Sequence, residues 1–110
     1  MSLLHTLVAT ASLLTCAATL ADVARYYDVA KGGHPHDVAA DPKGGPVYYT
    51  AQRTGRLGIL DPATGQYDEI ALGRNSAPHG VIVGPDGGVW IADGGQNAIV
   101  RFDPKSRQLK

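Results

Sequence analysis

The sequence lacks most of the features that stabilise a small domain or mark a well-known active site. It has one cysteine, Cys16, so no disulfide can form within the chain. Ten basic and ten acidic residues cancel, and no basic stripe appears, which excludes a nucleic-acid-binding surface. Gly-x-Ser-x-Gly, His-Glu-x-x-His and phosphate-loop motifs are absent. No stretch after Ala30 has a helical period free of glycine and proline, so the chain is expected to be all-β.

The N-terminal stretch from Leu3 to Leu20 is apolar or small, apart from His5 and several Ser and Thr. This pattern is typical of the apolar part of a secretory signal peptide, although Met1 to His5 contain no Lys or Arg. The stretch is shorter than a membrane-spanning helix of about 20 apolar residues. We predict a signal peptide over residues 1–21, a periplasmic or secreted protein, and no membrane span after signal removal. A lipid anchor on Cys16 and a folded N-terminal helix are the alternatives.

What the sequence does contain is 14 glycines and seven prolines, gathered between short apolar runs. They are typical of turns, and their pattern repeats. Pro35–Val38 (PHDV) returns 43 residues later as Pro78–Val81 (PHGV). Asp61-Pro62 returns 42 residues later as Asp103-Pro104. The chain therefore holds two copies of one unit.

Each copy predicts short strands with turns between them. In the first copy the expected strands are His36–Ala40, Val47–Ala51, Leu57–Leu60 and Tyr67–Leu72. In the second copy they are Gly80–Val83, Val89–Ala92 and Ala98–Phe102, with a fourth strand due to begin after Lys105. Four strands in about 43 residues form the blade of a β-propeller. A blade cannot bury both faces alone, so neighbouring blades must stack.

The repeat sets the expected organisation of the chain. We align Val47-Tyr48 with Trp90-Ile91 and place Tyr48 and Trp90 in the core between blades. Arg25 to Gly32 is similar to Tyr67 to Gly73, which predicts an outer, ring-closing strand and linker over residues 22–33. Residues 34–76 then form the first blade, and residues 77–110 form an incomplete second blade. Two blades cannot close a ring, so the expected fold is a partial β-propeller from a longer parent.

Residues Ala77 to Pro104 resemble the repeat of the streptogramin B (virginiamycin B) lyase family. That repeat runs Pro-His-Gly-Ile, Pro-Asp-Gly, Trp-Phe-Thr-Glu and Asn-x-Ile-Gly-Arg. The matching positions here are Pro78–Val81, Pro85–Gly87, Trp90–Asp93 and Asn97–Arg101. The first copy matches more loosely, and NHL, YVTN-type and gluconolactonase-like propellers share the same turns.

The resemblance implies a seven-bladed parent that opens a cyclic depsipeptide as a carbon–oxygen lyase, with a divalent metal, usually Mg²⁺. By motif, His79 matches the acting histidine of that family and Asp93 lies near its acidic position. The family's active pair belongs to a late blade, so the main catalytic residues are expected outside this chain. A lactonase-like hydrolase and a non-catalytic propeller, which binds a small-molecule or peptide ligand at its rim, are the alternatives.

The candidate side chains each allow two interpretations. His79 opens the inner strand of its blade, where a neutral imidazole could take a proton beside a carbonyl, or could instead hydrogen-bond the next blade. Asp93 could orient His79 or bind a metal, or could accept hydrogen bonds from loop amides. His34 and His36 form an alternating pair that could ligate a metal, with Asp37 as the nearest carboxylate, or could belong to an ordinary loop.

Overall fold

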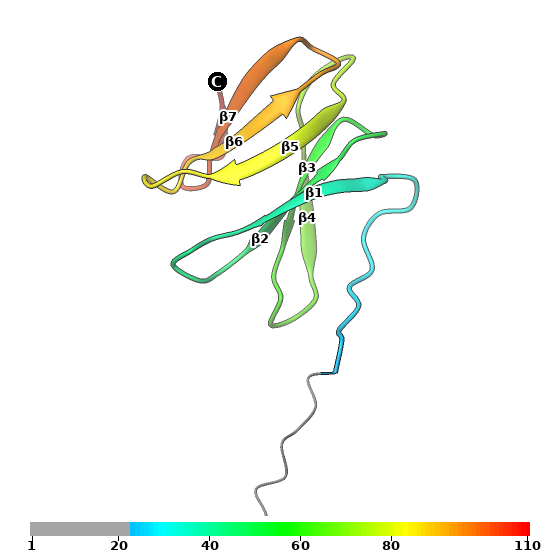
Figure 1. The fold of residues 1–110 in the computed structure, drawn as a ribbon, viewed down its shortest axis with the longest axis vertical. Helices are drawn as coiled ribbons and strands as arrows, with labels where there is room; N and C mark the ends of the chain where they lie inside the picture. The colour runs from blue at the N-terminus through cyan, green and yellow to red at the C-terminus, as the bar shows by residue number, and fades with distance from the viewer. Residues whose placement is uncertain (1–22) are drawn as a thin grey trace, which may run out of the picture.

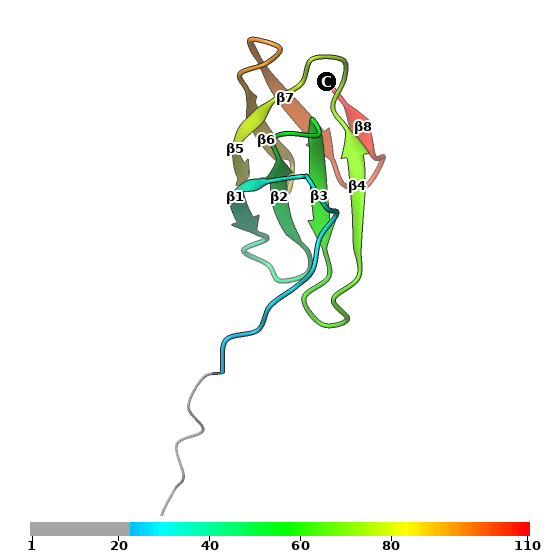
Figure 2. The same cartoon turned by 90° about the vertical axis from the view of Figure 1, so that its right-hand side faces the viewer.

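The computed structural model describes residues 23–110 and shows two four-stranded antiparallel sheets (Figure 1). The first sheet contains β1 (Pro35–Ala40), β2 (Val47–Ala51), β3 (Arg56–Leu60) and β4 (Tyr67–Ala71). The second contains β5 (Pro78–Val83), β6 (Val89–Asp93), β7 (Ala98–Asp103) and β8 (Gln108–Leu109). In each sheet the strands lie side by side in chain order, as Figure 2 shows for β1 to β4. The prediction of two propeller blades is confirmed.

Asp-Pro turns set where the strands end. Asp41, Asp61 and Asp103 each precede a proline, and each carboxylate accepts a hydrogen bond of 2.9 Å from the backbone N–H two residues later. The Asp86 carboxylate accepts from the Gly88 N–H in the same way, at 3.0 Å. These local bonds hold each reversal without help from the core. They explain why the predicted strand boundaries agree closely with the structure.

The strand register corrects the predicted alignment of the two blades. Val47 and Val89 hold the same place, since each begins the second strand of its sheet and pairs with the third. Tyr48 is therefore equivalent to Trp90, and the predicted alignment of this strand is wrong by one residue. The extra residue of the first blade is Pro46, in the turn before β2, rather than a residue in the loop after β2.

The main hydrophobic core lies between the two blades. The first blade contributes Tyr48, Leu57 and Leu72, and the second contributes Val81, Val89, Ile91, Val100 and Phe102. Each is less than 9% exposed, and Leu57, Val89, Ile91 and Phe102 are fully buried. Fully burying one such side chain contributes about 1.5–3 kcal/mol. Stacking of one blade on the other is therefore the main source of stability in the described part of the chain.

Tyr48 and Trp90 differ in burial although they hold equivalent positions. Tyr48 is 2% exposed, as predicted, whereas Trp90 is 41% exposed. The second blade covers the face of the first sheet that carries Tyr48, and no segment of residues 23–110 covers the corresponding face of the second sheet. The prediction that Trp90 lies in a core between blades is wrong for this chain.

The segment before β1 has no strand, so the outer strand predicted within residues 22–33 is not formed in the part that the structure describes. Among residues 23–110, no strand pairs with this segment. Tyr27 and Val29 nevertheless pack on a second cluster formed by Tyr49, Ala51 and Leu60. The predicted signal peptide, residues 1–21 with Cys16, lies outside the described residues. Within residues 23–110 no helix is long and apolar enough to cross a membrane.

Gly58 provides a test of how tightly the first blade is packed. A Cβ atom at this position would lie 1.9 Å from Cζ of the buried Tyr49 ring. We expect Gly58→Ala to displace that ring and to lower the free energy of unfolding by roughly 1–3 kcal/mol, measured by urea denaturation. In a Tyr49→Leu background the same substitution should cost much less. An equal cost in both backgrounds would contradict this explanation.

Candidate functional site at the junction of the inner strands

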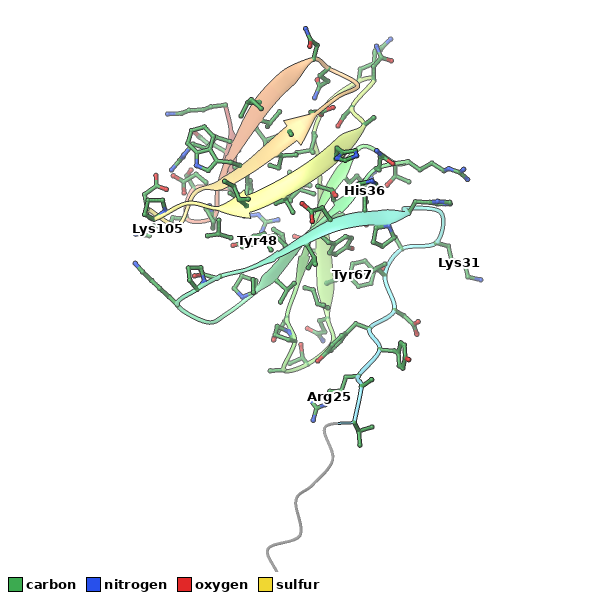
Figure 3. The ribbon with its side chains drawn as sticks, in the orientation of Figure 1. Arg25, Lys31, His36, Tyr48, Tyr67 and Lys105 are labelled. Carbon is green, nitrogen blue, oxygen red and sulfur yellow. The ribbon has the colours of Figure 1, made fainter. Side chains whose placement is uncertain are left out.

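Two histidines meet where the inner strands of the two blades lie side by side. His36 is the second residue of β1 and His79 the second residue of β5, and these two strands are in contact. The centroids of their imidazole rings are 3.8 Å apart and the ring planes are tilted by 42°. Both side chains are exposed, and Figure 3 shows His36 at this junction. The structure thus brings together two repeat-equivalent histidines that are 43 residues apart.

A polar latch from the first blade holds the backbone at His79 and, two residues later, at Val81. The fully buried Thr50 hydroxyl donates to the His79 carbonyl oxygen at 2.9 Å and accepts from the Asp37 N–H at 3.0 Å. Oδ2 of Asp37 accepts from the Val81 N–H at 2.9 Å. We call these contacts the Asp37–Thr50 latch. Because the latch binds main-chain atoms, it fixes the position of His79 and leaves its ring free.

The Asp37 carboxyl also carries the negative charge of the site. Its pKa is lowered, chiefly because its carboxylate accepts the Val81 N–H bond, with further contributions from the Val38 N–H and from the nearby His36 and His79. Hydrogen bonds to the charged form favour that form. Asp37 is therefore an anion at neutral pH, close to both imidazoles.

Asp93 lies at the end of β6 and is 2% exposed. Burial raises its pKa, but hydrogen bonds from Ser76, Gln96 and Ala77 outweigh burial, so the pKa is lowered overall. Its carboxylate accepts from the Ser76 hydroxyl, the Ala77, Gly95 and Gln96 N–H groups and the Gln96 side-chain amide. None of these donors is the His79 ring. Asp93 thus connects the loop that leads into β5 with the loop that follows β6. Its predicted catalytic role stays a prediction.

His34 does not pair with His36. It has a positive φ of 51° before β1 and is exposed, and the tilted His36 ring lies against the His79 ring instead. Within residues 23–110 no group of three or more His, Cys, Asp or Glu side chains could hold a metal ion. Mg²⁺ prefers carboxylate and water oxygens, and beside the histidine pair Asp37 is already bonded to Val81. The described residues do not fit the Mg²⁺ that the resemblance implies.

Sequence reasoning found His36, Asp37, His79 and Asp93 but missed Thr50, which completes the latch. Thr50 is the one non-aromatic polar residue of β2 (VYYTA). A hydroxyl in a strand that is otherwise buried must find a partner within the protein. This was the available signal, but the sequence could not show that the partner is a carbonyl of the next blade.

Comparison with known proteins shows that the fold of this chain is similar to part of a β-propeller. No protein-family model matches the chain. The chain is 43% identical over 54 residues to a gluconolactonase of Zymomonas mobilis subsp. mobilis, which covers 47% of this chain and 15% of that protein.

Solved structures share the fold at low sequence identity. A virginiamycin B lyase from Staphylococcus aureus matches with a TM-score of 0.70 and 22% identity, covering 78% of this chain and 29% of that one. A catalytically inactive form of the lyase, solved with quinupristin, matches with a TM-score of 0.66 and 23% identity, over 74% and 27%. Kuenenia stuttgartiensis hydrazine synthase matches with a TM-score of 0.65 and 16% identity, over 84% and 26%. The chain thus spans less than a third of each of these proteins.

The lowered pKa of Asp37 gives the latch a pH dependence. The pKa of Asp37 is lower in the folded chain than in the unfolded chain. The ionised carboxylate therefore stabilises the fold at pH values above the unfolded-state pKa. This stabilisation is lost as the pH falls through the folded-state pKa. We expect Asp37→Ala to lower the urea midpoint at pH 7, and the difference from wild type to narrow as pH falls below about 4. Asp28→Ala, at an exposed site outside the latch, should show no such narrowing. A constant Asp37→Ala difference across this range would contradict the latch.

Proposed function

We propose that this chain supplies two blades of an exported β-propeller that opens a cyclic ester, with His79 as the group that takes a proton. The observation that carries the proposal is the exposed His36–His79 pair on adjacent inner strands. The Asp37–Thr50 latch supports it, because it binds the His79 carbonyl oxygen and the Val81 N–H without using the His79 ring. The apolar N-terminus supports export.

The reaction that the likeness to virginiamycin B lyase favours is an elimination. A neutral imidazole of His79 removes a proton from the carbon beside a carbonyl. The electron pair left on that carbon forms a double bond, and the C–O bond on the alkyl side of the ester breaks. The oxygen leaves with the carboxylate, so the ring opens without water.

Hydrolysis of a lactone is the second candidate, and a different observation favours it. The 43% identity to gluconolactonase is higher than the identity to any of the lyase structures described above. In this reaction His79 takes a proton from a water molecule that attacks the ester carbonyl. The two candidates share the cyclic ester and the proton acceptor, and they differ in the bond that breaks.

Asp93 has a positioning role in either reaction. Its carboxylate holds Ser76 and Ala77, the residues that lead into the strand of His79. We expect Asp93→Asn to loosen this loop and to lower the rate while shifting the pH profile of the His79-dependent step little. A purely structural role would lower stability and leave the rate per folded molecule unchanged.

The test is ring opening of quinupristin and of gluconolactone by the purified protein, each followed by mass spectrometry. Elimination leaves the mass of quinupristin unchanged and creates a double bond, whereas hydrolysis adds one water. Loss of a general base lowers the rate by about 10²–10⁴, so we expect this fall in His79→Ala. His34→Ala is the matched control, because the structure leaves His34 outside the histidine pair.

Two outcomes would contradict the proposal. If His79→Ala opened either ring as fast as wild type, His79 would not be the proton acceptor. If wild type bound both compounds and opened neither, His79 would not carry out the reaction in this chain, and a role in ligand binding at the rim would be favoured.

A further inference from the structure

The outward face of the second blade is built like a surface that blades bury against each other. Ile82, Trp90 and Ile99 form this surface, which we call the back face, and they are 64%, 41% and 66% exposed. By register they are equivalent to Ala39, Tyr48 and Leu57 of the first blade. Those three side chains belong to the core between the blades or pack against it. The back face borders a hollow of about 500 Å³ that an adjoining blade would fill.

The opposite side of the molecule carries the complementary surface. Val38, Tyr49 and Leu60 form this front face of the first blade. By register they are equivalent to Val81, Ile91 and Phe102, the side chains with which the second blade covers the first. Val38 is 63% exposed, and the front face borders a hollow of about 320 Å³. One end of the molecule thus presents the surface that the other end is built to receive.

The segment before β1 lies where the outer strand of a preceding blade would pack against the front face. Tyr27 and Val29 pack on the front face, as Ile70 and Leu72 of the first blade, 43 residues later, pack on the second. Tyr27 and Val29 therefore hold the place of the outer strand of a preceding blade. In the second blade, β8 ends at Leu109, which holds the place of Tyr67, the first residue of β4, since Leu109 pairs with Phe102 as Tyr67 pairs with Leu60.

We propose that the back face of the second blade binds the front face of a second copy of this chain, head to tail. Residues 26–30 of the second copy then lie just beyond Lys110 and continue the outer strand of the second blade. Contacts of this kind close into a ring when the rotation between copies allows it. Propeller rings hold about four to eight blades, so the two blades of one copy do not close a ring alone. This assembly does not depend on the proposed reaction.

The contact between copies is weaker than the contact within one chain. Gly80 and Ala92 hold the places that Asp37 and Thr50 hold in the first blade. The second blade therefore lacks the latch and offers its neighbour apolar surface alone. Without the latch, we expect the association to be weak enough that the measured mass changes with protein concentration.

Trp90 reports on this contact directly, since it is the only tryptophan in the chain. We expect its fluorescence emission to move to shorter wavelength as concentration rises, together with an increase in mass by sedimentation velocity. Ile99→Arg should hold the protein at the mass of one chain and abolish the shift without loss of the β-sheet circular dichroism signal. Ala63→Arg, which places the same charge in the exposed β3–β4 turn, should assemble like wild type. A single-chain mass at every concentration would overturn the proposal.

A second variant tests the register of the contact by restoring the latch. Gly80→Asn with Ala92→Thr would give the back face an acceptor for the Val38 N–H of the next copy and a hydroxyl for its His36 carbonyl. Asparagine is chosen because Oδ2 of Asp37 would lie 3.7 Å from Cβ at position 80, where a second carboxylate would be repelled. Two added hydrogen bonds should tighten association roughly tenfold. Unchanged or weaker association would show that the copies do not meet in this register.

Discussion

Stacking of the second blade on the face of the first sheet that carries Tyr48 is the contact from which the other features of the structure follow. A four-stranded sheet of this sequence has apolar side chains on both faces and cannot cover either of them alone. When the second blade packs on Tyr48, Leu57 and Leu72, it also brings β1 and β5 together. The hydrophobic contact thus determines the distance between the two inner strands, and the polar groups of the candidate site are placed by it.

The Asp37–Thr50 latch converts this packing into a defined geometry. Hydrophobic contacts are not directional, so they permit small sliding movements of one blade on the other. Hydrogen bonds to the His79 carbonyl and to the Val81 N–H remove that freedom at the point where the two imidazoles meet. The candidate site is therefore formed by a pair of blades and not by either blade alone. The contacts between the blades fix the positions of its residues.

Much of the fold could be predicted from the sequence because its signals are local. The Asp-Pro turns and the 43-residue period located the strands and the blades. Two of the failures depended on residues far along the chain, whereas the alignment error was local. The alignment of the second strands of the two blades was wrong by one residue, because Pro46 lengthens a turn without changing the residue types around it. Trp90 was expected in a core between blades, but burial of its side chain requires an adjoining blade on that face. Thr50 was missed because its partner is a backbone carbonyl of the other blade.

The two copies of the repeat share their apolar framework and differ in their polar groups. Equivalent apolar positions are retained on both faces, since they decide whether blades stack. Asp37 and Thr50 are replaced by Gly80 and Ala92, and Ala51 is replaced by Asp93, which organises its own pair of loops. The junction between two blades can therefore carry a different polar set on the same framework. A likeness in fold to a lyase and a likeness in sequence to a gluconolactonase are compatible, because a shared fold does not fix the chemistry.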